Sequence, residues 1–212
     1  MKVGVIDYGV GNLGSVLRAL EELRVTPVLV NRATDMHATD SLILPGVGNF
    51  TDCVRLLDAG GWVTALRDEV QGYRRPLLGV CVGMQLLADN SSEGAAEGQY
   101  VAGLGFIPGQ VRHLRSFGCA QRVPHVGWNG ITRTGHNDYL FHTIPDGTDF
   151  YFVHSYAFSP RDSADVIATT DYGVPVTAAV RRGHVWGTQF HPEKSSRAGL
   201  RLLRNFIEGP TC

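Results

Sequence analysis

The chain has 212 residues with 19 basic and 20 acidic side chains, and 43% of it is apolar, which is typical of a globular rather than a disordered protein. At about 150 residues per domain, this length predicts a single domain over residues 1–212. The formal net charge of −1 provides no cationic field for nucleic acid or for an anionic membrane.

Short apolar runs alternate with amphipathic segments in the first half of the chain. The apolar runs predict strands, and the amphipathic segments, whose apolar residues recur at helical spacing, predict helices. Such alternation favours an α/β fold with a central, mostly parallel sheet flanked by helices. The expected strands are Lys2–Ile6, Pro27–Val30, Ser41–Leu44 and Pro76–Val80, and the expected helices are Leu13–Leu23, Asn49–Leu57, Trp62–Gln71 and Gly83–Ala88.

The sequence pattern changes from about Gln99 onward, where short β-like runs are separated by Gly, Pro and Asp. They predict an added antiparallel portion, closed by a final helix at Arg197–Ile207. Before them, Ser91–Gly98 (SSEGAAEG) is expected to be a mobile surface loop. The expected strands of this half are Val111–Leu114, Gln121–Val123, Gly147–His154, Val166–Thr170, Val176–Val180 and Val185–Phe190.

Targeting and metal-binding signals are missing from the sequence. The first apolar stretch ends at Asp7, which is too short for a signal peptide, and no run reaches the roughly 20 apolar residues of a membrane span. We therefore expect a cytoplasmic protein that binds neither membranes nor nucleic acid. The cysteines form no CxxC pair, so neither a metal site nor a disulfide framework is expected; they are Cys53, Cys81, Cys119 and Cys212.

Gly9, Gly11 and Gly14 form a GxGxxG pattern between the first strand and the first helix, which is the context of a dinucleotide site. An NADP-binding oxidoreductase is therefore one alternative. Against it, no acidic residue ends the second strand and no second βαβαβ half follows. The other interpretation is a tight glycine turn, with no cofactor expected.

The strongest local signal is Gly79-Val80-Cys81-Val82-Gly83, where an expected strand turns into an expected helix. This is the sulfur version of a nucleophile elbow, whose sharp turn needs glycine two positions to either side. The helix N-terminus favours the thiolate form of Cys81, and the N–H of Val82 is available to an oxyanion. A second N–H is expected from the glycine turn Leu44–Gly48, which ends the third strand.

A cysteine nucleophile needs a base, and the base needs an orienting group. His191 follows the last apolar strand, and Glu193 comes two residues later. Side chains at i and i+2 of an extended segment share a face, so Glu193 is expected to reach the imidazole and fix its tautomer. The sequence therefore predicts a Cys81–His191–Glu193 triad.

Together these motifs resemble the class I, triad-type glutamine amidotransferases. Within that family the chain is similar to the glutaminase subunits of imidazole glycerol phosphate synthase. The resemblance runs from Lys2 to about Ile207 and makes Gly14 incidental. It rests on Gly79–Gln85 (GVCVGMQ), Pro45–Gly48 (PGVG), Gln189–Ser195 (QFHPEKS), Asp7–Asn12 (DYGVGN), Pro124–Asn129 (PHVGWN) and Tyr151–Tyr156 (YFVHSY).

The resemblance implies that Cys81 attacks the carboxamide of glutamine to form a thioester. Val82 N–H and an N–H of the Val47–Gly48 turn would form the oxyanion hole, while His191, oriented by Glu193, would transfer protons. Residues implied around glutamine are Gly46, Gln85, His154, Ser155 and Tyr156, and residues implied at or near a partner interface are Asn12, Trp128 and Lys194.

Ammonia is then expected to pass to a separate synthase (cyclase) subunit of a heterodimer in histidine biosynthesis, since 212 residues leave room for the glutaminase fold alone. A related glutaminase that serves amidation in surface-polysaccharide synthesis remains a further alternative. The Ser91–Gly98 loop departs from the compact Ser-Glu-Glu segment usual in the family, so no substrate role is expected of it.

Overall fold

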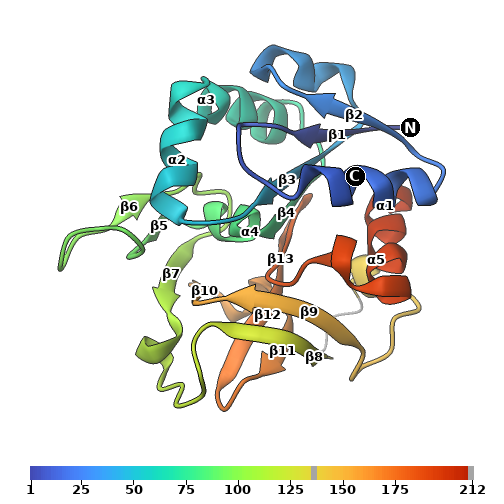
Figure 1. Ribbon diagram of the computed structural model, residues 1–212. Coiled ribbons are helices and arrows are strands. Elements are labelled where there is room, and N and C mark those ends of the chain that lie inside the picture. The colour runs from blue at the N-terminus through green and yellow to red at the C-terminus, as the bar shows by residue number, and fades with distance from the viewer. Residues whose placement is uncertain (135–137, 210–212) are drawn as a thin grey trace.

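The computed structural model describes residues 1–134 and 138–209, so Cys212 lies outside the described part of the chain. Figure 1 shows the path of the chain. Its helices are α1 (Leu13–Glu22), α2 (Phe50–Ala59), α3 (Trp62–Arg67), α4 (Val82–Leu86) and α5 (Ser196–Glu208). Its strands are β1 (Lys2–Ile6), β2 (Thr26–Val30), β3 (Ser41–Gly46), β4 (Leu77–Cys81), β5 (Asn90–Ser91), β6 (Val101–Ala102), β7 (Gly109–His113), β8 (His125–Arg133), β9 (Asp149–His154), β10 (Tyr156–Pro160), β11 (Val166–Asp171), β12 (Pro175–Arg182) and β13 (Val185–Thr188).

A nine-stranded sheet runs through the molecule in the order β2-β1-β3-β4-β13-β12-β11-β8-β9. The strands from β2 to β13 are parallel, whereas β12, β11, β8 and β9 continue the sheet antiparallel. Every residue of β3, β4 and β13 is buried, as expected for parallel strands covered on both faces. The predicted α/β class is therefore confirmed, with the antiparallel portion continuous with the parallel part.

Helices cover both faces of the parallel part. The chain moves from β1 to β2 in one direction and from β3 to β4 in the other, so right-handed crossovers place their helices on opposite faces. Accordingly, α2 and α3 lie on one side and α1 and α5 on the other (Figure 1). The parallel strands point their carboxyl ends to one edge, where ligand sites of such sheets form.

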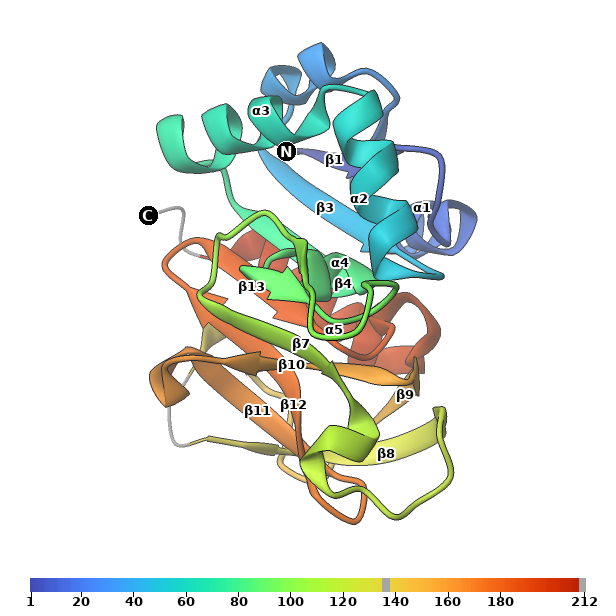
Figure 2. The same cartoon turned by 90° about the vertical axis from the view of Figure 1, so that its left-hand side faces the viewer.

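A smaller sheet, in the order β10-β7-β5-β6, packs beside the first. Figure 2 shows β7 and β10 in front of β11 and β12. Between them, Leu114, Cys119, Ala157 and Val176 form a small separate core. Residues 153–156, where β9 passes into β10, lie close to the end of β4, since the carbonyl of Val153 is 3.8 Å from Sγ of Cys81.

The predicted elements match the structure best in the first half. The third strand extends to Gly46, and the helix expected over Trp62–Gln71 is α3 followed by a π-helical turn at Asp68–Gly72. The strand expected at Gln121–Val123 is wrong, because these residues form bends that lead into β8. Strands β8 and β10 were not predicted as strands, since pairing with β9, β11 and β7 rather than local pattern makes them extended.

In the ranges 1–134 and 138–209, no helix combines the length and apolar character needed to cross a membrane.

Candidate functional site

Cys81 occupies the sharp turn between β4 and α4, with φ +56° and ψ −112°. Residues with a side chain rarely adopt this conformation, and such outliers gather at functional sites. A Cβ on Gly79 would lie 2.5 Å from the carbonyl oxygen of Gly83, and one on Gly83 would overlap the carbonyl oxygen of Leu44. The glycine requirement predicted for the elbow is therefore met by close backbone packing at both positions.

His191 lies beside Cys81 because β13 runs parallel to β4, with Thr188 opposite Val80. Its Nδ1 is 2.8 Å from Oε1 of Glu193, and only 2% and 1% of the two side chains are exposed. The carboxylate can only accept, so Nδ1 donates. The other nitrogen, Nε2, is buried without a hydrogen-bond partner among the described residues and is left for the sulfur.

The charge balance at His191 favours the imidazolium. Burial opposes the charge, but the sulfur of Cys81 and the carboxylate of Glu193 together raise the pKa of His191 to about 9. The predicted contact with Glu193 forms, although not on an extended segment. Pro192–Lys194 is instead a short 3-10 turn, held by the Ser195 hydroxyl, which donates to the carbonyl of His191 at 2.6 Å.

Asn12 lies at this site rather than only at a partner surface. Its Nδ2 donates to Oε1 of Glu193 at 3.1 Å. Asn12 precedes α1, but its side chain makes no capping bond to that helix. The DYGVGN loop therefore holds the carboxylate of Glu193, and no feature of the sequence predicts this contact.

The predicted oxyanion turn lies next to the elbow, because Gly46 at the end of β3 pairs with Cys81. A Cβ on Gly46 would lie 2.6 Å from the nitrogen of Gly83, so the two turns are in close contact. The carbonyl of Val47 accepts from the thiol of Cys53 at 3.6 Å and thus points toward α2. Val47, Gly48 and Val82 all line one cavity.

This cavity has a volume of about 330 Å³, which is within the usual range for small-molecule sites. It brings together most of the predicted site residues. Gly46 and Glu193 are not among the residues that line it. The lining residues are Val47, Gly48, Cys81, Val82, Gln85, Glu93, Pro124, Val153, His154, Ser155, Tyr156 and His191.

Glu93 lines the cavity, although the sequence predicts a mobile loop without a substrate role at Ser91–Gly98. Its carboxylate accepts from the backbone N–H of Phe50 at the start of α2 (2.9 Å), and its carbonyl accepts from the Thr51 hydroxyl (2.6 Å). Burial raises the pKa of Glu93, and the N–H bond opposes that rise. The only local signal was the acidic residue itself, since its place in the cavity depends on packing against α2.

His154 reaches the cavity but has no free ring nitrogen. Its Nδ1 is 2.8 Å from the carbonyl of Tyr156, and its Nε2 is 3.0 Å from Nδ1 of His125. Its predicted contact with glutamine would therefore use the ring surface and not a polar atom.

Trp128 and Lys194, two of the three residues predicted at a partner interface, are exposed beside the strands β8 and β9. Trp128 is 53% exposed, and its ring centroid lies 6.0 Å from that of Tyr151. Nζ of Lys194 lies 5.9 Å from the centroid of the Tyr151 ring. Val126 and Val153 extend the exposed apolar area.

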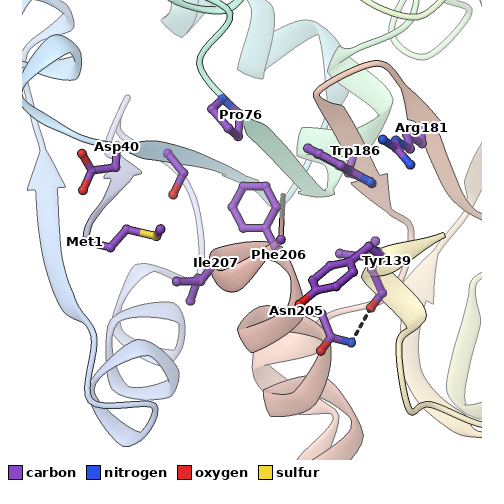
Figure 3. Close-up of a pocket in the computed structure, with 12 residues that line it drawn as sticks. Met1, Asp40, Pro76, Tyr139, Arg181, Trp186, Asn205, Phe206 and Ile207 are labelled. Carbon is purple, nitrogen blue, oxygen red and sulfur yellow. Dashed lines mark hydrogen bonds between the residues drawn. The ribbon is translucent and has the colours of Figure 1, made fainter. Parts of the chain in front are cut away.

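A second cavity lies at the amino ends of β3 and β4, at the opposite end of the parallel strands from Cys81 (Figure 3). Its volume of about 30 Å³ is that of roughly one water molecule. Arg181 bridges to Asp138 (2.9 Å) and Asn205 donates to the carbonyls of Leu140 and His142, whereas the buried hydroxyl of Ser41 has no hydrogen-bond partner among the described residues. A space of this size holds no metabolite, so we assign the site to the cavity over Cys81, which brings together most of the predicted site residues.

Comparisons with known proteins agree with this geometry. The family described as Glutamine amidotransferase class-I matches residues 4–209. The imidazole glycerol phosphate synthase subunit HisH of Moorella thermoacetica is 47% identical, over 97% of this chain and 94% of its own length. The subunit of the same name from Rhodospirillum rubrum is 44% identical, over 98% of each chain.

Solved structures share the fold at lower identity. A crystal structure of a glutamine amidotransferase superposes with a TM-score of 0.73 at 24% identity, covering 97% of each chain. PurLQS from Thermotoga maritima superposes with a TM-score of 0.71 at 16% identity, also covering 97% of each chain. The chain therefore belongs to the class I glutamine amidotransferase family and, within it, to the HisH subunits of imidazole glycerol phosphate synthases.

Proposed function

We propose that the chain hydrolyses glutamine to glutamate and ammonia at Cys81 and delivers the ammonia to a separate synthase subunit in histidine biosynthesis. The observation that carries the proposal is the cavity of about 330 Å³ that ends on Cys81, with the buried His191–Glu193 pair beside the sulfur. Relatives at 44% and 47% identity are named subunits of imidazole glycerol phosphate synthase, which supports the assignment of the partner.

In the first half of the reaction, the thiolate of Cys81 attacks the carboxamide carbon of glutamine. As the C–S bond forms, the carbonyl oxygen takes up negative charge, and the N–H of Val82 and an N–H of the Val47–Gly48 turn donate to it. His191 then gives its proton to the departing nitrogen. The C–N bond breaks, ammonia leaves and a thioester remains on Cys81.

In the second half, a water molecule gives a proton to His191 and attacks the thioester. The C–S bond breaks, glutamate leaves, and the proton held by His191 restores the resting pair. In both halves Glu193 accepts from Nδ1–H of His191, which keeps Nε2 available for proton transfer and stabilises the imidazolium. Asn12 holds the carboxylate of Glu193 in place.

The rest of the cavity suits the charged end of glutamine. Among the described residues that line it, Glu93 is the only acidic one; the N-terminus of α2 holds its carboxylate, so we assign it the α-ammonium group. Gln85 donates internally to Tyr156 and Gln189, which leaves its Oε1 for the substrate. Ser155 contributes to the wall beside them.

The partner is proposed to cover the exposed surface of Trp128 and Lys194, close to the Asn12 loop. We further propose that residues 1–212 work as one glutaminase domain and that the heterodimer is cytoplasmic. The comparisons support neither the polysaccharide-amidation nor the NADP-binding alternative. The structure also favours another role for the glycine turn than NADP binding, because the side chain of Asn12, which follows the turn, donates to Glu193.

The test compares Cys81→Ala with the wild type, each assembled with the synthase subunit. Glutamine-dependent product formation should be abolished, whereas formation from ammonium salts should persist, because only the ammonia supply is removed. Cys119→Ala is the matched control, since Cys119 is buried in the small separate core. Loss of both activities in Cys81→Ala would contradict the proposed division of labour.

A further inference from the structure

A chain of hydrogen bonds leads to the sulfur of Cys81 through the side chains of Gln85 and Gln189. Gln189, directly after β13, is fully buried, and its Nε2 lies 3.9 Å from Sγ of Cys81. Its Oε1 accepts from Nε2 of Gln85 at 3.0 Å. Because Gln85 holds the oxygen end of this amide, the end that faces the sulfur is the N–H donor.

Gln85 is itself fixed in orientation. Its Nε2 donates a second time, to the carbonyl of Tyr156 at 2.9 Å, so both hydrogens of this nitrogen are used inside the protein. A flipped Gln85 would place its oxygen against two acceptors, the carbonyl of Tyr156 and Oε1 of Gln189. The carbonyl of Tyr156 therefore fixes the orientation of Gln85, and Gln85 in turn fixes Gln189 with its Nε2 toward the sulfur.

The same carbonyl of Tyr156 is also bonded to His154, which is in turn bonded to His125. The carbonyl can only accept, so Nδ1 of His154 carries a proton and Nε2 of His154 must accept from Nδ1 of His125. Nε2 of His125 is then left to accept from Asn129 at 3.5 Å. Burial lowers the pKa of His154 to about 3 and that of His125 to about 4, so both rings are neutral and this direction of bonding holds.

We propose that Gln189 is a positioning residue that donates a hydrogen bond to the thiolate of Cys81 and thereby keeps the nucleophile charged and aimed into the cavity. The proposal deepens the proposed function and rests on it for its catalytic meaning. The contact is long in the structure, at 3.9 Å, and the neutral thiol form of Cys81 would direct its proton to the carbonyl of Val153, 3.8 Å away. Bonds to a charged acceptor are shorter and stronger, so this one tightens when the proton leaves.

The test measures the reactivity of Cys81 in the full chain without glutamine. Iodoacetamide alkylation of Cys81 is followed by mass spectrometry as a function of pH in the wild type, Gln189→Met and Gln189→Glu. Methionine keeps the length of the side chain but removes the donor, and glutamate adds an acceptor with negative charge. Gln121→Met, at an exposed position, is the matched control.

In Gln189→Met, the pH of half-maximal alkylation should rise by about one unit, because a hydrogen bond to a charged group is worth about 1.5 kcal/mol or more and one pH unit is about 1.4 kcal/mol. Gln189→Glu should shift it further, and Gln121→Met should leave it unchanged. His191, Tyr8 and Cys53, the other titratable groups that act on this sulfur, are retained in all variants. A structural role alone would change thermal stability without moving this pH.

Unchanged alkylation profiles in folded Gln189→Met and Gln189→Glu would overturn the proposal. Should these variants not fold, the side-chain amide protons of Gln189 in the wild type give the same answer by NMR, since their resonance should titrate with the alkylation midpoint. A resonance that does not move overturns the proposal. The outcome can be distinguished from failure of the proposed function. If the chain hydrolyses glutamine but the pH of half-maximal alkylation does not shift in the variants, only the role of Gln189 is refuted. If that pH shifts but the chain hydrolyses no glutamine, only the proposed function is refuted.

Discussion

Gly79→Ala tests how tightly the elbow must fit. The added Cβ would lie 2.5, 2.7 and 2.8 Å from the oxygen and carbon of Gly83 and the nitrogen of Met84. These are backbone atoms of α4 and cannot rotate away. A carbon–oxygen contact settles at about 3.3 Å, so α4 must retreat from β4 by about 0.8 Å.

That displacement carries Val82 N–H and the sulfur of Cys81 away from the turn at the end of β3. Since a misplacement of about 1 Å can reduce rate on the order of 100-fold, kcat/KM for glutamine should fall by tens of fold or more. Overpacking of this kind costs about 1–3 kcal/mol of unfolding free energy. For a chain of this size each kcal/mol lowers Tm by about 2–4 °C.

The assay is glutamate release with the partner subunit present, together with thermal unfolding. Gly14→Ala is the control, because its Cβ would meet only Nη1 of Arg18, at 3.6 Å, on the surface of α1. Alanine favours a helix over glycine by about 0.8–1 kcal/mol, so this control should be slightly stabilised and fully active. Wild-type kcat/KM in Gly79→Ala, or equal losses in both variants, would refute the steric reasoning.

Glu193→Gln removes a carboxylate that raises the pKa of His191, so NMR titration of this imidazole should give a value below about 9, and an unchanged titration would contradict the pairing. Asn12→Ala should lower kcat/KM about tenfold through the loss of its bond to Glu193; steady-state kinetics that match the wild type would exclude this role. Burial holds the pKa of His125 at about 4, below its ordinary value of about 6.5, so the folded chain binds fewer protons than the unfolded chain between these pH values. The free energy of unfolding should therefore fall as pH falls from about 6.5 to 4, and urea unfolding should show a weaker fall in His125→Asn.

Much of the site could be predicted because its chemistry lies in short segments. Cys81 between two glycines identifies a strand-to-helix elbow on steric grounds alone, and the separation of His191 from Glu193 lets the pair meet without the rest of the fold. Buried apolar runs likewise predicted β3 and β4, since parallel strands covered on both faces need them. Local sterics and patterning determine these features.

The length, composition and charge of the chain excluded whole classes of function, but they could not show which distant residues meet. Gln189 and Cys81 are 108 residues apart, and Asn12 and Glu193 are 181 apart. Their contacts exist because β13 pairs with β4 and the β1 loop ends at the same edge of the sheet. Glu93 enters the cavity only through its bond to the start of α2. Strand order and register are set by packing of the whole chain, so the tertiary structure alone decided what surrounds the nucleophile.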